Sequence, residues 1–86
     1  MQEHRKILQE NIAKIIKSHR TASITKCADE INLGKSIWSN LEQGKKDPQF
    51  STLWRIAEGL NIKPHQLVKE IEEELGDNFS FLEDTF

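Results

Sequence analysis

The chain has 86 residues, enough for one domain with a single modest core, and 36% of them are hydrophobic and 30% charged, as in an ordinary globular protein. No apolar run approaches the roughly 20 residues that a bilayer span needs, and the N-terminus lacks the pattern of a secretory signal, so we expect a cytoplasmic protein without a membrane partner. The formal net charge of −2 argues, taken alone, against a nucleic-acid partner.

Two helices are predicted in the first third of the chain. Hydrophobic residues recur at three- and four-residue spacing over residues 4–18, which predicts an amphipathic helix. The segment SHRTAS breaks this pattern, and Ser23 within it is a suitable N-cap for a second helix. That helix is expected to end near Ile31, because Asn32 readily adopts the left-handed conformation that terminates helices.

A third helix is predicted over residues 35–43, between Gly34 and the helix-ending Gly44. Trp38 and Leu41 are three residues apart and therefore point to the same side of it. The remaining directions are occupied by polar side chains, namely Lys35, Ser36, Ser39, Asn40 and Gln43.

Pro48 predicts a loop after the third helix, because proline biases the preceding residue away from helical geometry. Ser51 or Thr52 is the expected N-cap of a fourth helix, which runs through Leu60. Trp54 lies off the apolar line of that helix, so we expect it to be partly exposed and free to help a subunit contact.

Pro64 is well suited to the first turn of a fifth helix, which Gly76 ends. The five helices predict an all-α domain over residues 1–75, and only the short segment FSFL reads as a conceivable strand. Residues 76–86 form an acidic tail that nevertheless contains the hydrophobic side chains Phe79, Phe81, Leu82 and Phe86.

The second and third helices are joined by Asn-Leu-Gly, a turn short enough for a helix-turn-helix. In that motif the first helix packs behind the second, whose other side enters the DNA major groove. Ala28 is small enough for a close helix crossing. Trp38 and Leu41 supply the inner side of the helix predicted over residues 35–43, which is the second helix of the motif. The polar outer side then predicts contacts with DNA bases.

From about Ile7 to Val68 the sequence resembles the lambda-repressor/Cro-like helix-turn-helix family, often called the Xre type. The resemblance rests on ADEINLGKSIWSNLEQGKKDP followed by LWRIAEGLNIKPHQL, which include the patterns S-x-x-E-x-G and L-x-x-I-A-x-x-L. It implies a five-helix, lambda-repressor-like DNA-binding domain with double-stranded DNA as its partner.

The resemblance also implies roles for individual residues. Lys45 and Lys46 fall where the family contacts phosphate, and the start of the fourth helix offers backbone amides to another phosphate, at Ser51 and Thr52. The residues that fall on or beside the positions contacting base edges are Lys35, Ser36, Ser39 and Asn40.

Lys17 lies where the family often places a basic residue that pairs with the glutamate matching Glu42, which predicts a structural pair between the first and third helices. Two positions depart from the family pattern. Ile24 stands where a phosphate-holding glutamine is common, so one backbone anchor is absent. Gly34 stands where serine or threonine is more usual, so the third helix is expected to be capped less firmly.

Charge is unevenly distributed along the chain. Residues 1–46 hold nine Lys/Arg and five Asp/Glu, whereas residues 47–86 hold three Lys/Arg and nine Asp/Glu. Such asymmetry indicates a surface that faces a polyanion. A charge run is also typical of a merely solvated face, and Lys45 and Lys46 by themselves fit a solvated turn.

One helix-turn-helix module spans few base pairs, so useful specificity calls for a homodimer. The expected dimer contact is the chain after Leu67, where Val68, Ile71 and Leu75 continue past the core and the tail adds its phenylalanines. The alternative is that the tail folds back on its own core or stays disordered.

These patterns predict a sequence-specific DNA-binding transcriptional regulator, most readily a repressor that binds an operator as a homodimer. The alternative is a protein-interaction module, such as an antitoxin that binds a partner protein through its C-terminal segment. No catalytic set, cofactor-binding loop or metal-ligand spacing is recognisable, so neither an enzyme nor a cofactor is expected. The single cysteine, Cys27, is interpreted as a small buried hydrophobe.

Overall fold

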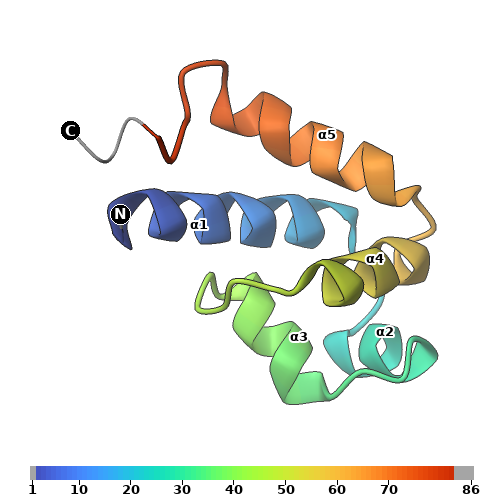
Figure 1. Cartoon of the computed structure of the whole chain (residues 1–86). Helices are drawn as coiled ribbons and strands as arrows, with labels where there is room; N and C mark the ends of the chain where they lie inside the picture. The colour runs from blue at the N-terminus through green and yellow to red at the C-terminus, as the bar shows by residue number, and fades with distance from the viewer. Residues whose placement is uncertain (1, 83–86) are drawn as a thin grey trace.

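Five α-helices form the fold of residues 2–82, the part of the chain that the computed structural model describes (Figure 1). No strand occurs among these residues, and the segment FSFL is irregular. The prediction of an all-helical chain is confirmed. The helices are α1 (Gln2–His19), α2 (Ile24–Glu30), α3 (Lys35–Glu42), α4 (Phe50–Gly59) and α5 (Pro64–Leu75).

Most helix ends follow from the predicted local signals. The Ser23 hydroxyl accepts a hydrogen bond from the backbone N–H of Lys26 (3.1 Å) and caps α2. Asn32 has a φ of 56°, in the left-handed region, just after α2 ends. Gly44, with a φ of 72°, follows α3 in the same way, and Pro64 is the first residue of α5.

The start of α4 differs from the prediction. Its N-cap is Gln49, whose backbone is extended and whose carbonyl accepts the N–H of Leu53 (3.0 Å). Ser51 and Thr52 therefore lie inside the first turn, and neither caps the helix. Glutamine is not a favoured capping residue, and no side-chain hydrogen bond caps this helix end.

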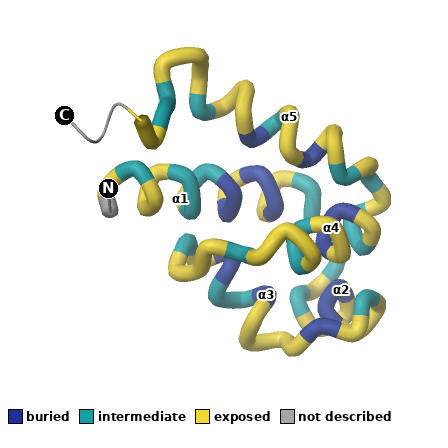
Figure 2. The backbone as a smooth tube through the Cα atoms, in the orientation of Figure 1, coloured by how far each residue is buried: buried dark blue, intermediate teal, exposed yellow. Residues whose placement is uncertain are grey.

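Helix α1 occupies the middle of the molecule, with α3 packed on one side and α5 on the other (Figure 1). Helix α2 packs against α3 and α4, and α4 in turn contacts α5. The side chains between these helices make one core, and Figure 2 marks in dark blue where along the backbone the buried residues lie. Its largest fully buried members are Trp38, Ile16, Leu41, Ile56 and Leu67.

The end of α5 and the tail pack against other helices of the same chain. Ile71 is buried and Leu75 packs against the core, so these two residues are not the free dimer contact that the sequence predicted. Beyond α5 the ring of Phe79 lies 5.5 Å from that of His4 in α1, and Phe81 packs edge-on against Phe79 at 5.4 Å. Up to Leu82 the tail therefore folds back on α1, whereas Phe86 lies outside the described residues.

Gly59 allows α2 and α4 to approach closely. A Cβ atom added at Gly59 would lie only 2.7 Å from Cγ2 of Ile31, a branch methyl that cannot swing away. We expect Gly59→Ala to lower the free energy of unfolding by about 1–2 kcal/mol, because overpacking outweighs the roughly 1 kcal/mol that alanine normally gains in a helix. Urea unfolding measures this change, with the exposed neighbour Glu58→Ala as the control; a stabilised Gly59→Ala would contradict the close packing.

His19 and Glu70 join the end of α1 to α5, with 2.7 Å between His19 Nε2 and Glu70 Oε1. The hydrogen bond from His19 lowers the pKa of Glu70, against the opposing effect of burial. The unfolded chain then binds more protons at Glu70 than the folded chain does. The contribution of Glu70 to stability is therefore present above the ordinary glutamate pKa and is lost as the pH falls through the lowered pKa.

We therefore expect Glu70→Gln to flatten the decrease in stability on acidification below about pH 5. The effect should be no more than about 1 kcal/mol, because both side chains are partly solvated. Urea midpoints measured across this pH range test it, with the exposed Glu73→Gln as the control. A Glu70→Gln curve that runs parallel to the wild-type curve would contradict the assignment.

Candidate nucleic-acid interface

Helices α2 and α3 are packed from within by three buried residues. Trp38 is fully buried on the inner side of α3, Leu41 lies one turn further along, and Ala28 of α2 has no exposed surface. The absence of a larger side chain at position 28 lets the two helices cross closely. The apolar residues on the inner side of α3 are thus the two that the sequence assigned to the core, and Glu42 is buried beside them.

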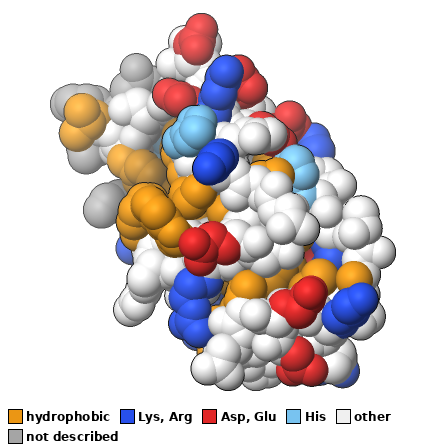
Figure 3. All heavy atoms as spheres, turned by 90° about the vertical axis from the view of Figure 1, so that its right-hand side faces the viewer, with side chains coloured by type: hydrophobic (Ala, Val, Ile, Leu, Met, Phe, Trp, Pro, Cys, Tyr) orange, Lys and Arg blue, Asp and Glu red, His pale blue; other side chains and the backbone are white. Residues whose placement is uncertain are grey.

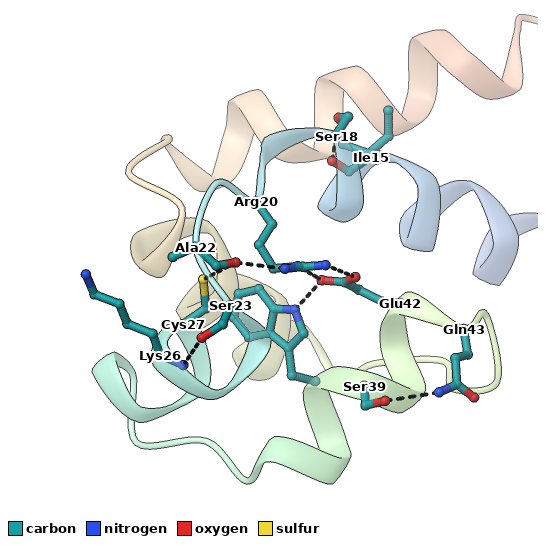
Figure 4. A network of polar contacts seen from close by, with 11 residues as sticks. Ile15, Ser18, Arg20, Ala22, Ser23, Lys26, Cys27, Ser39, Glu42 and Gln43 are labelled. Atoms are coloured by element: carbon teal, nitrogen blue, oxygen red, sulfur yellow. Dashed lines mark hydrogen bonds and ion pairs between the residues drawn. The ribbon is translucent and has the colours of Figure 1, made fainter.

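The outer side of α3 is polar and accessible at its N-terminal end. Lys35 and Ser36 are exposed, whereas Ser39 and Asn40 are only partly exposed. The Ser39 hydroxyl also accepts a hydrogen bond from the side chain of Gln43 (3.0 Å; Figure 4). Figure 2 shows the continuous exposed backbone at the start of α3, on the side away from α1.

Ile37 adds an apolar element to this surface, because it is exposed between the polar residues of the first turn. It lies off the line of Trp38 and Leu41, and this offset is the sequence signal for its exposure. An exposed aliphatic side chain on such a helix is suited to contact the methyl group of thymine.

A buried carboxylate fixes α3 against the rest of the protein (Figure 4). The side chain of Glu42 is only 5% exposed, and both of its oxygens accept hydrogen bonds from Arg20, at 2.5 Å from Nε and 3.1 Å from Nη2. The indole N–H of Trp38 donates to the same carboxylate at 2.6 Å. Arg20 makes a third hydrogen bond from Nη1 to the backbone carbonyl of Ala22 (2.7 Å).

The hydrogen bond to Glu42 raises the pKa of the Arg20 guanidinium, so this group carries its charge at every relevant pH. Burial acts in the opposite direction and is outweighed. The ion pair therefore ties α3 to the chain between α1 and α2. It also removes the carboxylate of Glu42 from the outer side of α3, where it would repel phosphate.

The predicted pair between Lys17 and Glu42 is wrong. Lys17 is exposed, and Glu42 pairs with Arg20, which lies just beyond the end of α1. The planar guanidinium contacts both carboxylate oxygens at once, which a lysine ammonium does not do from the helix surface. Lys17 and Arg20 are three residues apart, so spacing alone did not distinguish them.

The residues predicted to contact phosphate follow α3 in the chain. Lys45 and Lys46 are both exposed in the loop, and the neighbouring Asp47 lies 3.9 Å from Arg5 of α1. Ser51 is exposed and Thr52 half-buried in the first turn of α4. The N–H groups of such a first turn have no partner within the helix and are therefore available to an anion.

Arg55 of α4 supports the turn between α2 and α3, a role that the sequence analysis missed. Its guanidinium donates to the carbonyls of Ile31 (3.0 Å) and Asn32 (2.9 Å), at the end of α2. Carbonyl groups at a helix C-terminus lack helical partners, and a nearby arginine satisfies them. No sequence pattern links Arg55 to Asn32 and Ile31, which lie 23 and 24 positions earlier in the chain.

Within residues 2–82, no group of three or more His, Cys, Asp or Glu side chains is arranged to hold a metal ion. No described helix has both the length and the apolar character needed to cross a membrane. Cys27 is buried in α2.

No model of a protein family matches the chain, and neither the curated proteins nor the solved structures contain a significant match to it.

Proposed function

We propose that this protein is a sequence-specific DNA-binding transcriptional regulator with a lambda-repressor-like fold, and that it acts as a repressor by occupying an operator as a homodimer. The observation that carries the proposal is the orientation of α3. Trp38 and Leu41 point inward, and Glu42 holds the indole of Trp38 by a hydrogen bond, whereas Lys35 and Ser36 point to solvent.

The chemistry of the outer face supports major-groove recognition. Lys35 can donate to O6 or N7 of guanine, and Asn40 can form two hydrogen bonds with adenine. Ser36 can either donate or accept, so it tolerates several bases. The exposed Lys45 and Lys46 supply positive charge for the DNA backbone immediately after α3.

Selection of bound DNA from a random-sequence library tests the proposal. We expect the wild-type protein to enrich a motif with two-fold symmetry, its half-sites about one helical turn apart. Lys35→Glu is the matched control, because it places a carboxylate on an exposed position of α3 and should abolish enrichment without unfolding the protein. A library in which the wild-type protein enriches no motif would refute sequence-specific binding.

A second candidate function is protein binding through the C-terminal segment, as in an antitoxin. The exposure of Phe81 and Leu82 at the end of the described tail favours it. We expect a partner to co-purify with the full chain and to be lost from a chain truncated after Gly76. Retention of the partner by the truncated chain would refute binding through this segment.

A further inference from the structure

The chain reverses direction at Gly76, directly after α5, and residues 76–82 return toward the start of α1 (Figure 1). We call residues 76–82 the strap. Gly76 has a φ of 87° and a ψ of 171°, a combination that is essentially restricted to glycine. A Cβ atom added there would have no described atom within 4 Å. The glycine is therefore required by the backbone of the turn and not by close packing.

His4 of α1 holds the other end of the strap. Its ring centroid lies 5.5 Å from that of Phe79 and 6.3 Å from that of Phe81. The two phenylalanine rings meet edge-on, with 83° between their planes. Separations of roughly 4.5–7 Å are those at which aromatic rings attract one another. Among the described residues, both ring contacts between the strap and α1 thus involve His4.

The strap is only partly buried in this closed position. Phe79 is half-buried, whereas Phe81 is 43% and Leu82 77% exposed. Leu75, the last residue of α5, packs against the core, so the well-packed part of the chain ends just before Gly76. A segment with few buried apolar contacts opens locally at a lower free energy than the whole domain. The strap can therefore open while the five helices stay folded.

An open strap presents two aromatic side chains in a pattern suited to a strand. Phe79 and Phe81 are two residues apart, so they point to the same side of an extended segment. They belong to FSFL, the segment that the sequence suggests as a conceivable strand and that is irregular in the fold. Extended segments bind by adding a strand to the edge of a sheet, which supplies pockets for alternate side chains.

We propose that the strap is an autoinhibitory element, which His4 keeps closed against α1 and whose release offers Phe79 and Phe81 to the edge of a β-sheet in a partner protein. His4 and the partner compete for the ring of Phe79. The affinity that is measured for the partner is then lowered by the fraction of chains in which the strap is open. The closed strap itself needs no partner, and only the occupant rests on the second candidate function.

Charge describes the partner further. Residues 76–86 include the acidic side chains Asp77, Glu83 and Asp84 and no lysine or arginine. A sheet edge bordered by basic side chains is complementary to this segment, and an acidic edge would repel it.

Limited proteolysis with chymotrypsin tests the strap. This protease takes an aromatic side chain into an apolar pocket and acts on a segment that lies extended in its cleft, so cleavage after Phe79 requires an open strap. When opening and closing are faster than cleavage, the rate follows the open fraction. Fragment masses identify the bond that is cut. Cleavage after the fully buried Trp38 reports unfolding of the whole domain and provides the reference rate.

We expect His4→Ala to raise the rate of cleavage after Phe79 at least about three-fold, because the ring contacts with α1 are lost. His4→Phe should restore the wild-type rate, because a phenyl ring replaces the imidazole. Gly76→Ala should raise the rate at least about five-fold without changing His4, because alanine is strained at this φ. Cleavage after Trp38 should keep its wild-type rate in all three variants.

Phe50→Ala is the matched control. It too removes one ring from an exposed aromatic contact, because Phe50 lies 5.9 Å from Trp54 in α4. These two residues line a groove between α4 and α5, and Figure 3 shows hydrophobic side chains gathered on that face. The lining of the groove includes no residue of the described strap. Cleavage after Phe79 should therefore change less than about two-fold in this variant.

Cleavage after Phe79 that is unchanged in both His4→Ala and Gly76→Ala overturns the proposal, as does a His4→Phe rate equal to that of His4→Ala. A partner that co-purifies with the full chain should bind His4→Ala more tightly, by the factor measured in proteolysis, and equal affinity overturns autoinhibition. If cleavage responds as expected but no partner distinguishes the full chain from the chain truncated after Gly76, control of the strap by His4 is supported and the second candidate function is refuted.

Discussion

Replacement of Arg20 by alanine is expected to lower the free energy of unfolding by about 3–5 kcal/mol, one of the two largest effects that we predict. The reason is that the carboxylate of Glu42, whose side chain is 5% exposed, would remain buried without its guanidinium partner and would keep the hydrogen bond from the indole N–H of Trp38. A buried charge without a counter-ion carries a large desolvation cost. Urea unfolding at neutral pH measures the loss.

Replacement of Glu42 by alanine should lower the free energy of unfolding less than replacement of Arg20 does. In Glu42→Ala the charge left behind belongs to Arg20, whose side chain is 24% exposed and keeps its bond to the carbonyl of Ala22. Water can therefore solvate it in part. Lys17→Ala is the control, because Lys17 is exposed, and its effect should stay within about 0.5 kcal/mol. An effect of Lys17→Ala equal to that of Arg20→Ala would contradict the network in Figure 4.

The second large effect concerns DNA and rests on the proposed function. Asn40→Ala is expected to remove about 1–3 kcal/mol of discrimination at one position in each half-site, because alanine cannot form the two hydrogen bonds with adenine. Binding to sequences that already lack this adenine should change little. The measurement is the ratio of Kd values for the selected operator and for the operator changed at that one base pair.

Lys46→Ala should act differently on the same operators. It should weaken binding to every sequence alike and lower the slope of log K against log salt by about one per chain, because a phosphate contact and its released counter-ion are lost. Lys14→Ala is the control, because Lys14 pairs with Glu74 of α5 rather than with the loop after α3. An Asn40→Ala variant that loses affinity equally for all sequences would contradict the role of Asn40 in base recognition.

The helices could be predicted because their signals are local. Ser23 caps α2 through a residue three positions away, and Asn32 and Pro64 act through their own backbone angles. The apolar periodicity of each segment identified its inner face before any contact was known, and Trp38 lies there. These features require no knowledge of what the helix packs against.

Apart from the start of α4, where Gln49 rather than Ser51 or Thr52 precedes the helix, the errors concern contacts between distant segments. The choice of Arg20 over Lys17 depends on the path of the chain after α1, and the contact of Arg55 with the turn depends on how α4 crosses α2. Ile71 reads as surplus apolar surface until α5 is seen to pack on α1. Each case requires the relative placement of two helices, which periodicity within one helix does not contain.

The buried position of Cys27 has a practical consequence for following motion in this protein. It is the only cysteine of the chain, and it lies on the buried side of α2, in the core. A thiol reagent reaches it only when this part of the structure opens, so the rate of alkylation reports local opening. The alkylation rate of Cys27 therefore reports opening of the half of the molecule that we propose reads DNA. Operator binding should lower this rate.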